Sequence, residues 1–434
     1  MIIINQKQFM WLSIVLLMFV SLLLLVGPRV PTAMQKKDCV VNVHIVGPFG
    51  ISMACDSPEY ILDAVHPSHL LKKDSVRQSR PGLSLAAYVV SKPLSFLNTL
   101  SRAYHPKLTR SDIKSSRANA LLQSGLSVFA AYALLNLATL IAACYLFFSM
   151  VRVHKGITLA TMSLLVMLLI NPATEAYFWS PHDQMFNIMG PLLLVWIGYQ
   201  GFHSSVFERK WYWISAMLGL LVTAYGLFLL FAPVLFLIFV YQFTVKFNNT
   251  AGIGRYIVRL AVHAVVFIVP TLIWYLYVMH TTGSYYVHEA AAFHQFTWII
   301  SGLHQGVGYV LHRLVQNAIW TMTMMVRYSY WLLLIIVGLI VTLRQLKFAS
   351  WDKGRLVVFG VMTALFILFS TFNGYIAPHV EFTVVPIFII TCAYLIECLS
   401  TQLSAGAQKI VLAGCVGSMA VYATITYVYL YYLP

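Results

Sequence analysis

The chain has 434 residues, of which 60% are hydrophobic and only 9% are charged, and its mean hydropathy is +0.79. This composition excludes an ordinary water-soluble globular protein. Apolar stretches long enough to cross roughly 30 Å of hydrocarbon recur along the sequence. We therefore predict an all-α, polytopic integral membrane protein.

The formal net charge of +15 invites a nucleic-acid-binding interpretation, but the basic residues do not form one binding face. They lie mostly between hydrophobic stretches or in one long polar segment. A bias of Lys and Arg toward the cytoplasmic side, with contact to anionic lipid, explains this distribution better. We expect the membrane as a partner and no nucleic acid.

The first hydrophobic stretch, residues 9–26, is longer than a usual signal-peptide core and lacks a clear cleavage site, so we expect an uncleaved anchor helix. About eleven membrane spans follow from the hydrophobic pattern. Their expected ranges are 9–27, 123–150, 157–171, 185–202, 211–225, 227–243, 256–278, 326–343, 356–372, 382–399 and 410–431. Two short spans within 211–243, rather than one long span, place the basic loops on one side, as the positive-inside rule requires.

In this topology residues 28–118 form a long first external loop, and the whole chain, 1–434, forms one transmembrane domain. Ten of the 13 carboxylates and 11 of the 14 histidines then fall on the external side. Such clustering favours a chemical site there, against the simpler alternative that the inner loops are merely short and basic.

The six cysteines show no metal-binding spacing. Four of them lie in apolar sequence: Cys144, Cys392, Cys398 and Cys415. Cys39 and Cys55 share the first external loop and would be able to pair if that loop faces an oxidising compartment. Spacing alone leaves their pairing open.

The first external loop contains the sequence Asp-Ser-Pro-Glu-Tyr-Ile, which begins at Asp56. Pro58 suits the first turn of a helix, and Asp56 or the serine after it would cap that helix. We expect the helix over residues 58–65, with Glu59 near its start. A carboxylate there can act as a general base or bind a metal ion. The alternative is a capped amphipathic helix on the membrane surface.

Arg77 and Arg80, within Arg-Gln-Ser-Arg-Pro, end the polar part of this loop. Guanidinium groups bind phosphate oxygens through paired hydrogen bonds. The apolar segment 83–100 is interrupted by Lys92 and Pro93, so we expect it to lie in the membrane interface. The two arginines suit a lipid-linked phosphate, and ordinary contact with anionic headgroups explains them equally well.

Further candidate substrate contacts lie in three later external segments. They are Glu175, His182, Asp183, His288, Glu289 and His379. The first three share a short aromatic loop and can reach the same cavity as Asp56. With His294, the pair at 288–289 forms a His/Glu/His cluster that would be able to bind a metal, but its spacing matches no compact zinc motif, which favours substrate contact. His379 lies at the outer end of a span, where an unpaired polar group is costly and usually functional.

With these pieces in order, the chain resembles the GT-C glycosyltransferases, polytopic enzymes that use polyprenyl-phosphate-linked sugars. Their hallmark is an acidic motif in the first external loop that supplies the general base, and Asp56 with Glu59 and Tyr60 matches its position. An Arg-Pro element like that at Arg80 follows in many bacterial members. The chain departs from the family where no acidic residue adjoins Asp56, and where His379 stands in place of a phosphate-binding Arg or Lys.

The resemblance implies an inverting glycosyltransferase of the bacterial inner membrane, with its site on the extracytoplasmic side. It would move a sugar from a polyprenyl-phosphate donor to a lipid or glycan acceptor, with Asp56 and Glu59 as catalytic residues and Tyr60, Arg77 and Arg80 in the substrate site. A divalent cation, Mg²⁺ or Mn²⁺, stays open as a cofactor. The alternative functions are a transporter or flippase, or an O-antigen ligase or polymerase, acting on lipid-linked sugars.

Overall fold

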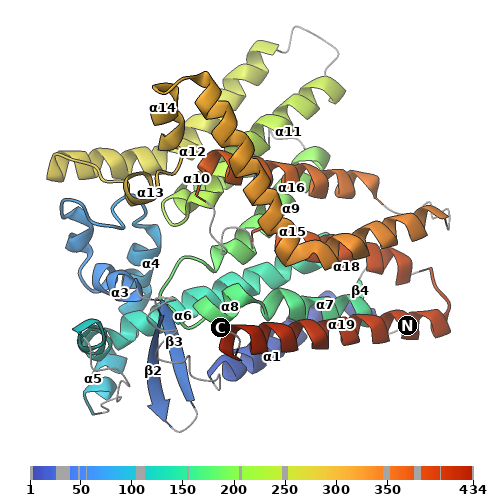
Figure 1. The fold of residues 1–434 in the computed structure, drawn as a ribbon, viewed down its shortest axis with the longest axis horizontal. Helices are drawn as coiled ribbons and strands as arrows, with labels where there is room; N and C mark the ends of the chain where they lie inside the picture. Colours follow the sequence, from blue (N-terminus) through green and yellow to red (C-terminus); the bar gives the residue numbers. More distant parts are fainter. Residues whose placement is uncertain are drawn as a thin grey trace.

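The chain folds into a helical membrane protein in the computed structural model (Figure 1). The structure describes residues 3–25, 40–46, 49–54, 56–103, 113–153, 156–204, 208–246, 253–345, 352–375, 383–400 and 402–432. It is 82% helical and all-α, and the described strands form only two short antiparallel pairs. The predicted class is therefore confirmed.

Six helices are long and apolar enough to cross a membrane. They lie in α1 (Gln6–Leu25), α6 (Ile113–Val151), η2 and α11 (Gly226–Leu230, Phe231–Lys246), α12 (Ile253–Thr282), α16 (Lys353–Asn373) and α19 (Ala405–Tyr432). A seventh span exists if the two halves of α15 (Val307–Gln345), bent by 77°, count as one. Length and composition thus support a membrane-embedded protein.

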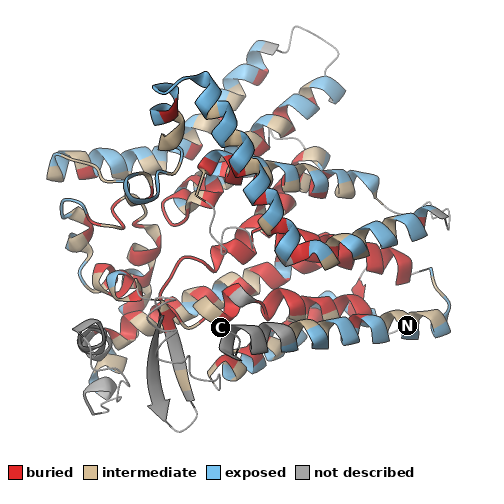
Figure 2. Cartoon of the chain, viewed as in Figure 1, coloured by how far each residue is buried: buried red, intermediate tan, exposed pale blue. Residues whose placement is uncertain are grey.

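The structure corrects the expected number of spans. Four of the eleven expected ranges are occupied by helices outside this set: α7 (Leu159–Leu169), α9 (Phe186–His203), α10 (Arg209–Val222) and α18 (Val385–Ser400). The 11 residues of α7 extend only about 16 Å, roughly half of the hydrocarbon thickness. Every residue of α18 is buried (Figure 2). Helices α7, α9 and α18 are mostly buried, and they are apolar because they fill the protein interior, which hydropathy alone cannot distinguish from lipid. Helix α10 exposes apolar side chains, but its 14 residues are too few to cross a membrane. The predicted sidedness of the loops depended on eleven spans, so it stays a prediction.

The first polar segment (residues 28–118) contains a β-hairpin, which was not expected from its sequence. Its strands are β2 (Val40–Val46) and β3 (Phe49–Ala54). The segment continues with α3 (Ser57–Val65), η1 (Pro67–Leu71), α4 (Gly82–Ser91) and α5 (Phe96–Ala103). The break between α4 and α5 contains Lys92 and Pro93, and neither helix is long enough to cross a membrane.

The remaining described elements are short. They are β1 (Ile3–Asn5), its partner strand β4 (Gly156–Thr158), α8 (Pro172–Tyr177), α13 (His288–Phe293) and α14 (Thr297–Leu303). The β1–β4 pair holds the start of α1 beside the start of α7. Two of the others, α8 and α13, lie next to the residues of the candidate site.

Helix α6 connects the polar segment to the rest of the molecule, because it packs against α1, α3, α4, α5 and α9. The hydroxyl of Tyr132, in the middle of α6, donates to the carbonyl oxygen of Tyr60 at 2.9 Å and lies 3.1 Å from the hydroxyl of Ser84. All three side chains are buried. These bonds fix α3 and α4 against a membrane-spanning helix, and so position the candidate site.

Candidate active site

Asp56 occupies the junction between β3 and α3. Its carbonyl oxygen accepts the first hydrogen bond of α3, from the amide of Glu59 at 3.0 Å, but its side chain makes no capping bond. The next residue, Ser57, is fully buried and hydrogen-bonded to the hydroxyl of Ser180 at 2.7 Å. The local sequence therefore starts the helix as predicted, while the Asp56 carboxylate stays available for other partners.

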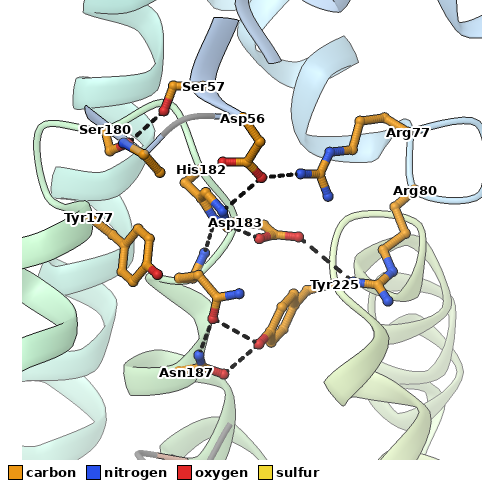
Figure 3. Close-up of polar contacts among 12 residues, drawn as sticks. Asp56, Ser57, Arg77, Arg80, Tyr177, Ser180, His182, Asp183, Asn187 and Tyr225 are labelled. Atoms are coloured by element: carbon orange, nitrogen blue, oxygen red, sulfur yellow. Dashed lines mark hydrogen bonds and ion pairs between the residues drawn. The ribbon is translucent and has the colours of Figure 1, made fainter. Parts of the chain in front are cut away.

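Two cationic side chains flank the Asp56 carboxylate (Figure 3). A terminal nitrogen of Arg77 donates to its Oδ2, and the Nε2 of His182 lies 3.1 Å from the same oxygen. Burial opposes the carboxylate charge, but His182 and Arg77 outweigh it and lower the pKa of Asp56. Asp56 is consequently ionised, and it is a weak base for as long as both cations are bound.

His182 bridges two carboxylates. Its Nδ1 lies 2.9 Å from Asp183, and the amide N–H of Gln184 also points at Nδ1, at 3.2 Å. Burial disfavours the charged ring, yet Asp56 and Asp183 outweigh burial and raise the pKa of His182 to about 9. A protonated Nδ1 donates and cannot accept, so near neutral pH the contact with Asp183 holds and the Gln184 contact does not.

The charges continue from Asp183 toward α13. Arg80 lies 3.9 Å from Asp183 and 3.2 Å from Glu289, whose other oxygen accepts a hydrogen bond from Ser79 at 3.2 Å. Burial raises the pKa of Asp183, but His182 and the arginines outweigh it and hold that pKa well below its usual range. Positive and negative groups thus alternate through one charged cluster, which consists of Asp56, Arg77, Arg80, His182, Asp183 and Glu289.

Arg77 contacts Asp56 from an enclosed position, and its guanidinium group has further contacts. It is 8% exposed, and its guanidinium carbon lies 4.0 Å from the ring centre of Tyr60. Within the described part of the chain, its buried Nε has no hydrogen-bond acceptor. A buried donor without a partner costs about 1–3 kcal/mol, so the Nε is a candidate contact for a ligand.

Buried side-chain amides position these groups. The Nδ2 of Asn136, on α6, donates to the carbonyl oxygens of Tyr177, Phe178 and Ser180 at 3.1, 2.9 and 3.2 Å, which holds the aromatic loop (residues 178–185) in place. Gln78 fixes the segment that carries the arginines, because its Oε1 accepts from the amide of residue 286 at 2.6 Å. Neither amide was predicted, since an isolated Asn or Gln carries no motif.

Gly82 sets the distance between the arginine segment and the end of α10. Its amide donates to the carbonyl oxygen of Thr223 at 2.8 Å. A Cβ at this position would lie 2.5 Å from the Thr223 hydroxyl, so no larger residue fits without a shift. The glycine after Arg80 and Pro81 is therefore required to bring Arg80 against Asp183.

A cavity of about 240 Å³, here called the Arg80 cavity, opens beside the cluster. Its polar lining includes Ser79, Arg80, Gln184, Tyr225, Glu289 and Asn373, and its apolar lining includes Leu227, Leu229, Phe296 and Phe369. Tyr225 lines this cavity, and its hydroxyl donates to Asn187 at 2.6 Å (Figure 3). Tyr225, Gln184 and Asn373 were not predicted as site residues, because they lie at helix ends without a recognisable pattern.

Other predicted site residues lie apart from the cluster. Glu59 is exposed and is the third residue of α3. Glu175 is buried, neither oxygen has a partner among the described residues, and burial raises its pKa to about 8. The His288 Nδ1 lies 3.2 Å from the Tyr286 hydroxyl. His379 and the cysteine pair 39 and 55 lie outside the described residues.

The cluster carboxylates do not offer a divalent-cation site. Among the described residues, no three His, Cys, Asp or Glu side chains are grouped as metal ligands. Asp56 and Asp183 face His182 and an arginine, and Glu289 faces Arg80. Protein cations therefore stand where Mg²⁺ or Mn²⁺ would have to bind these oxygens.

No protein-family model matches the sequence, and no curated protein and no solved structure shows significant similarity to it.

Proposed function

We propose that this protein is a membrane glycosyltransferase of the GT-C type, which moves a sugar from a polyprenyl-phosphate donor to an acceptor hydroxyl. Asp56 is the general base, and Arg77 and Arg80 bind the phosphate. The site faces the extracytoplasmic side of a bacterial inner membrane, as the resemblance implies. The local geometry supports the chemistry, and the sequence motif around Asp56 supports the family.

The observation that carries the proposal is the buried Nε of Arg77, which lacks an acceptor in the described structure although Arg77 also contacts Asp56. Phosphate oxygens suit such a fork of donors. Arg80, 19% exposed at its side chain, lines the adjoining cavity and supplies a second guanidinium. A base and a phosphate site therefore adjoin each other, as transfer from a sugar phosphate requires.

The arrangement also explains how a weak base becomes active. A bound phosphodiester competes with Asp56 for Arg77, and a carboxylate that loses a cationic partner gains affinity for a proton. Asp56 then removes the acceptor proton while the acceptor oxygen bonds to the anomeric carbon. The bond from that carbon to the phosphate oxygen breaks, and its electron pair leaves with the phosphate. The arginines stabilise the charge that develops there.

A transporter or flippase of lipid-linked sugars is the second candidate. Charges that bind transported substrates usually lie within spans and face a central cavity. Here the charged cluster lies in the first polar segment, the aromatic loop and α13, outside the six candidate spans. This placement favours the enzyme.

The test uses the purified protein in lipid nanodiscs, with polyprenyl-phosphate sugars labelled in the sugar and an envelope extract as acceptor. We expect label to move from the donor to the extract, and no transfer from sugar nucleotides. Passage of intact donor across a proteoliposome membrane without cleavage of the sugar–phosphate bond would instead establish the transporter. Failure to cleave any polyprenyl-phosphate sugar would overturn the enzyme proposal.

A further inference from the structure

We infer that the acceptor is a membrane lipid that carries a hydroxyl group, and that its hydrocarbon chain lies in a groove between α1, α5 and α6. This inference rests on the proposed function and narrows its acceptor to one chemical class. The groove, here called the α1–α6 groove, has a volume of about 460 Å³.

The walls of the groove are almost entirely apolar. They include Leu17, Met18, Leu97, Ala133, Leu134 and Trp179. No charged residue contributes to the described lining. Such a surface gains free energy by burying hydrocarbon and offers nothing to neutralise a charged ligand.

The surrounding helices identify what covers this surface. Both α1 and the apolar part of α6 are candidate membrane spans. Met18 and Leu134, at the edge of the groove, are 61% and 47% exposed, so in a bilayer they contact hydrocarbon. A lipid chain can therefore enter the groove sideways from the membrane without passing through water.

The lining of the groove is connected to the charged cluster through the aromatic loop. Phe178 and Trp179 belong to the lining, and His182 follows three residues after Trp179. The indole nitrogen of Trp179 donates to the carbonyl oxygen of Ser21 on α1 at 3.2 Å, which fixes the loop against α1. Ser180, the next residue, is hydrogen-bonded to the neighbour of Asp56, Ser57. The head of a lipid seated in the groove consequently lies near Asp56.

Charge distinguishes the acceptor from the donor. The Arg80 cavity contains a guanidinium group, whereas the α1–α6 groove contains no charged side chain in its described lining. The donor carries a phosphate that needs a cationic partner, so we assign the donor to the Arg80 cavity. In Figure 1, α5, which contributes to the lining of the groove, lies on the other side of α3 and α4 from α13, which borders the cavity. An in-line displacement needs acceptor and leaving group on opposite sides of the anomeric carbon, as this arrangement allows.

The reaction is then balanced as an alcohol transfer. The lipid hydroxyl gives its proton to Asp56 and its oxygen bonds to the anomeric carbon. The sugar–phosphate C–O bond breaks, and the phosphate keeps the electron pair. The product is a glycolipid, and no oxidant, reductant or other reactant is required.

The test measures lipid binding without transfer. The wild-type protein in phosphatidylcholine nanodiscs is photolabelled with a benzophenone diacylglycerol, a hydroxyl lipid without phosphate, and separately with a benzophenone polyprenyl phosphate. We expect the diacylglycerol probe to label residues 127–141 of α6. We expect Ala133→Phe, which fills the groove, to reduce this labelling about tenfold, an affinity difference of about 1.4 kcal/mol. The matched variant Val265→Phe, on the exposed face of α12, should leave it unchanged.

A second measurement does not depend on how the variant folds. In the wild type, excess unlabelled diacylglycerol should suppress labelling of 127–141 but not of the exposed face of α12. The inference would be overturned if unlabelled diacylglycerol reduced labelling of residues 127–141 and of the exposed face of α12 equally. It would also be overturned if the polyprenyl phosphate probe labelled the groove in preference to the diacylglycerol probe. Asp56→Asn should keep the labelling, because binding precedes chemistry. If Ala133→Phe loses groove labelling but keeps normal sugar transfer, the lipid acceptor is refuted and the proposed function is not. If Asp56→Asn transfers sugar normally, the proposed function is refuted.

Discussion

Two of the buried carboxylates in the described structure, Asp183 and Glu397, differ in their partners. In the charged cluster, Asp183 is 3% exposed and faces His182 and Arg80. In α18, Glu397 is 2% exposed and accepts hydrogen bonds from the amide and hydroxyl of Thr158 and the hydroxyl of Thr161, at 2.8, 2.9 and 2.7 Å. No cation pairs with Glu397 in the described structure.

The different partners of Asp183 and Glu397 indicate different roles for the two carboxylates. Thr158 caps α7, so Glu397 sits at a helix N-terminus, where the peptide dipoles stabilise its charge. Its donors are fixed by the fold and have no reason to exchange partners. The cluster carboxylates instead pair with guanidinium groups, whose donors also suit phosphate oxygens. We infer that the first region is built to change partners during a reaction and the second to hold α7 against α18.

The largest expected effect on stability comes from removing one member of a buried charge pair. Asp183→Asn leaves His182 and Arg80 without a carboxylate between them, which costs about 3 kcal/mol. Glu397→Gln keeps a hydrogen-bond acceptor among neutral donors and should cost less, about 1–2 kcal/mol. Unfolding of the purified variants in detergent, followed by circular dichroism, measures both. A larger loss of stability in Glu397→Gln than in Asp183→Asn would contradict the different roles inferred for the two carboxylates.

Exchange of an arginine for a lysine should reduce sugar transfer in the charged cluster but not at a distant arginine. Arg80→Lys loses the paired donors for phosphate, and transfer should fall about 10–100-fold, as expected for a lost charge-assisted hydrogen bond of 1.5–3 kcal/mol. Arg355→Lys is the matched control. Arg355 donates to the carbonyl oxygens of Met150 and Arg152 at 2.9 and 3.0 Å, far along the chain from the cluster. Equal losses of transfer in the two folded variants would remove the phosphate role from Arg80.

The pH dependence of stability should differ between the regions. The folded-state pKa of His182, about 9, lies above its ordinary value of 6.5. The stabilisation from its charge is therefore fully present below pH 6.5 and is lost as the pH rises toward 9. The stability difference between wild type and His182→Gln should shrink over this window. A difference that grows with pH, or a pH effect abolished by Glu397→Gln instead, would contradict the assignment of charge to His182.

The smallest effect is expected at Glu175. Burial raises its pKa to about 8, so at neutral pH the group is largely a neutral acid, and the described residues offer it no partner. Glu175→Gln is nearly isosteric with that acid and should change stability by less than about 0.5 kcal/mol. Thermal unfolding at pH 7 measures this. A large destabilisation would show that the carboxylate is charged and paired.

The sequence predicted the helical membrane class and the start of α3 because both depend on local composition. Pro58 lies in the first turn of the helix, as expected, and the break at Lys92 and Pro93 separates α4 from α5. The number of spans could not be predicted in the same way. The interior of α18 is as apolar as a lipid-facing helix, and only tertiary packing shows that all of it is buried.

The site was predictable only in part, for a similar reason. Charged residues are rare in this chain, so Asp56, Arg80 and His182 stood out by type alone. Their pairing depends on Asn136 and Gln78, whose amide groups bond to backbone carbonyl and amide groups that no sequence motif announces. Distances between segments more than a hundred residues apart follow from packing on α6, which the sequence does not encode locally.

The central claim is that Asp56 removes the acceptor proton, and sugar transfer by Asp56→Asn at neutral pH tests it most directly. The matched control is Asp74→Asn, the same change at an exposed position of the same segment, where asparagine tolerates the positive φ of 61°. We predict that folded Asp56→Asn loses transfer by roughly 10²–10⁴-fold, as for a lost general base, while Asp74→Asn matches the wild type. Transfer by Asp56→Asn at the wild-type rate would contradict the account.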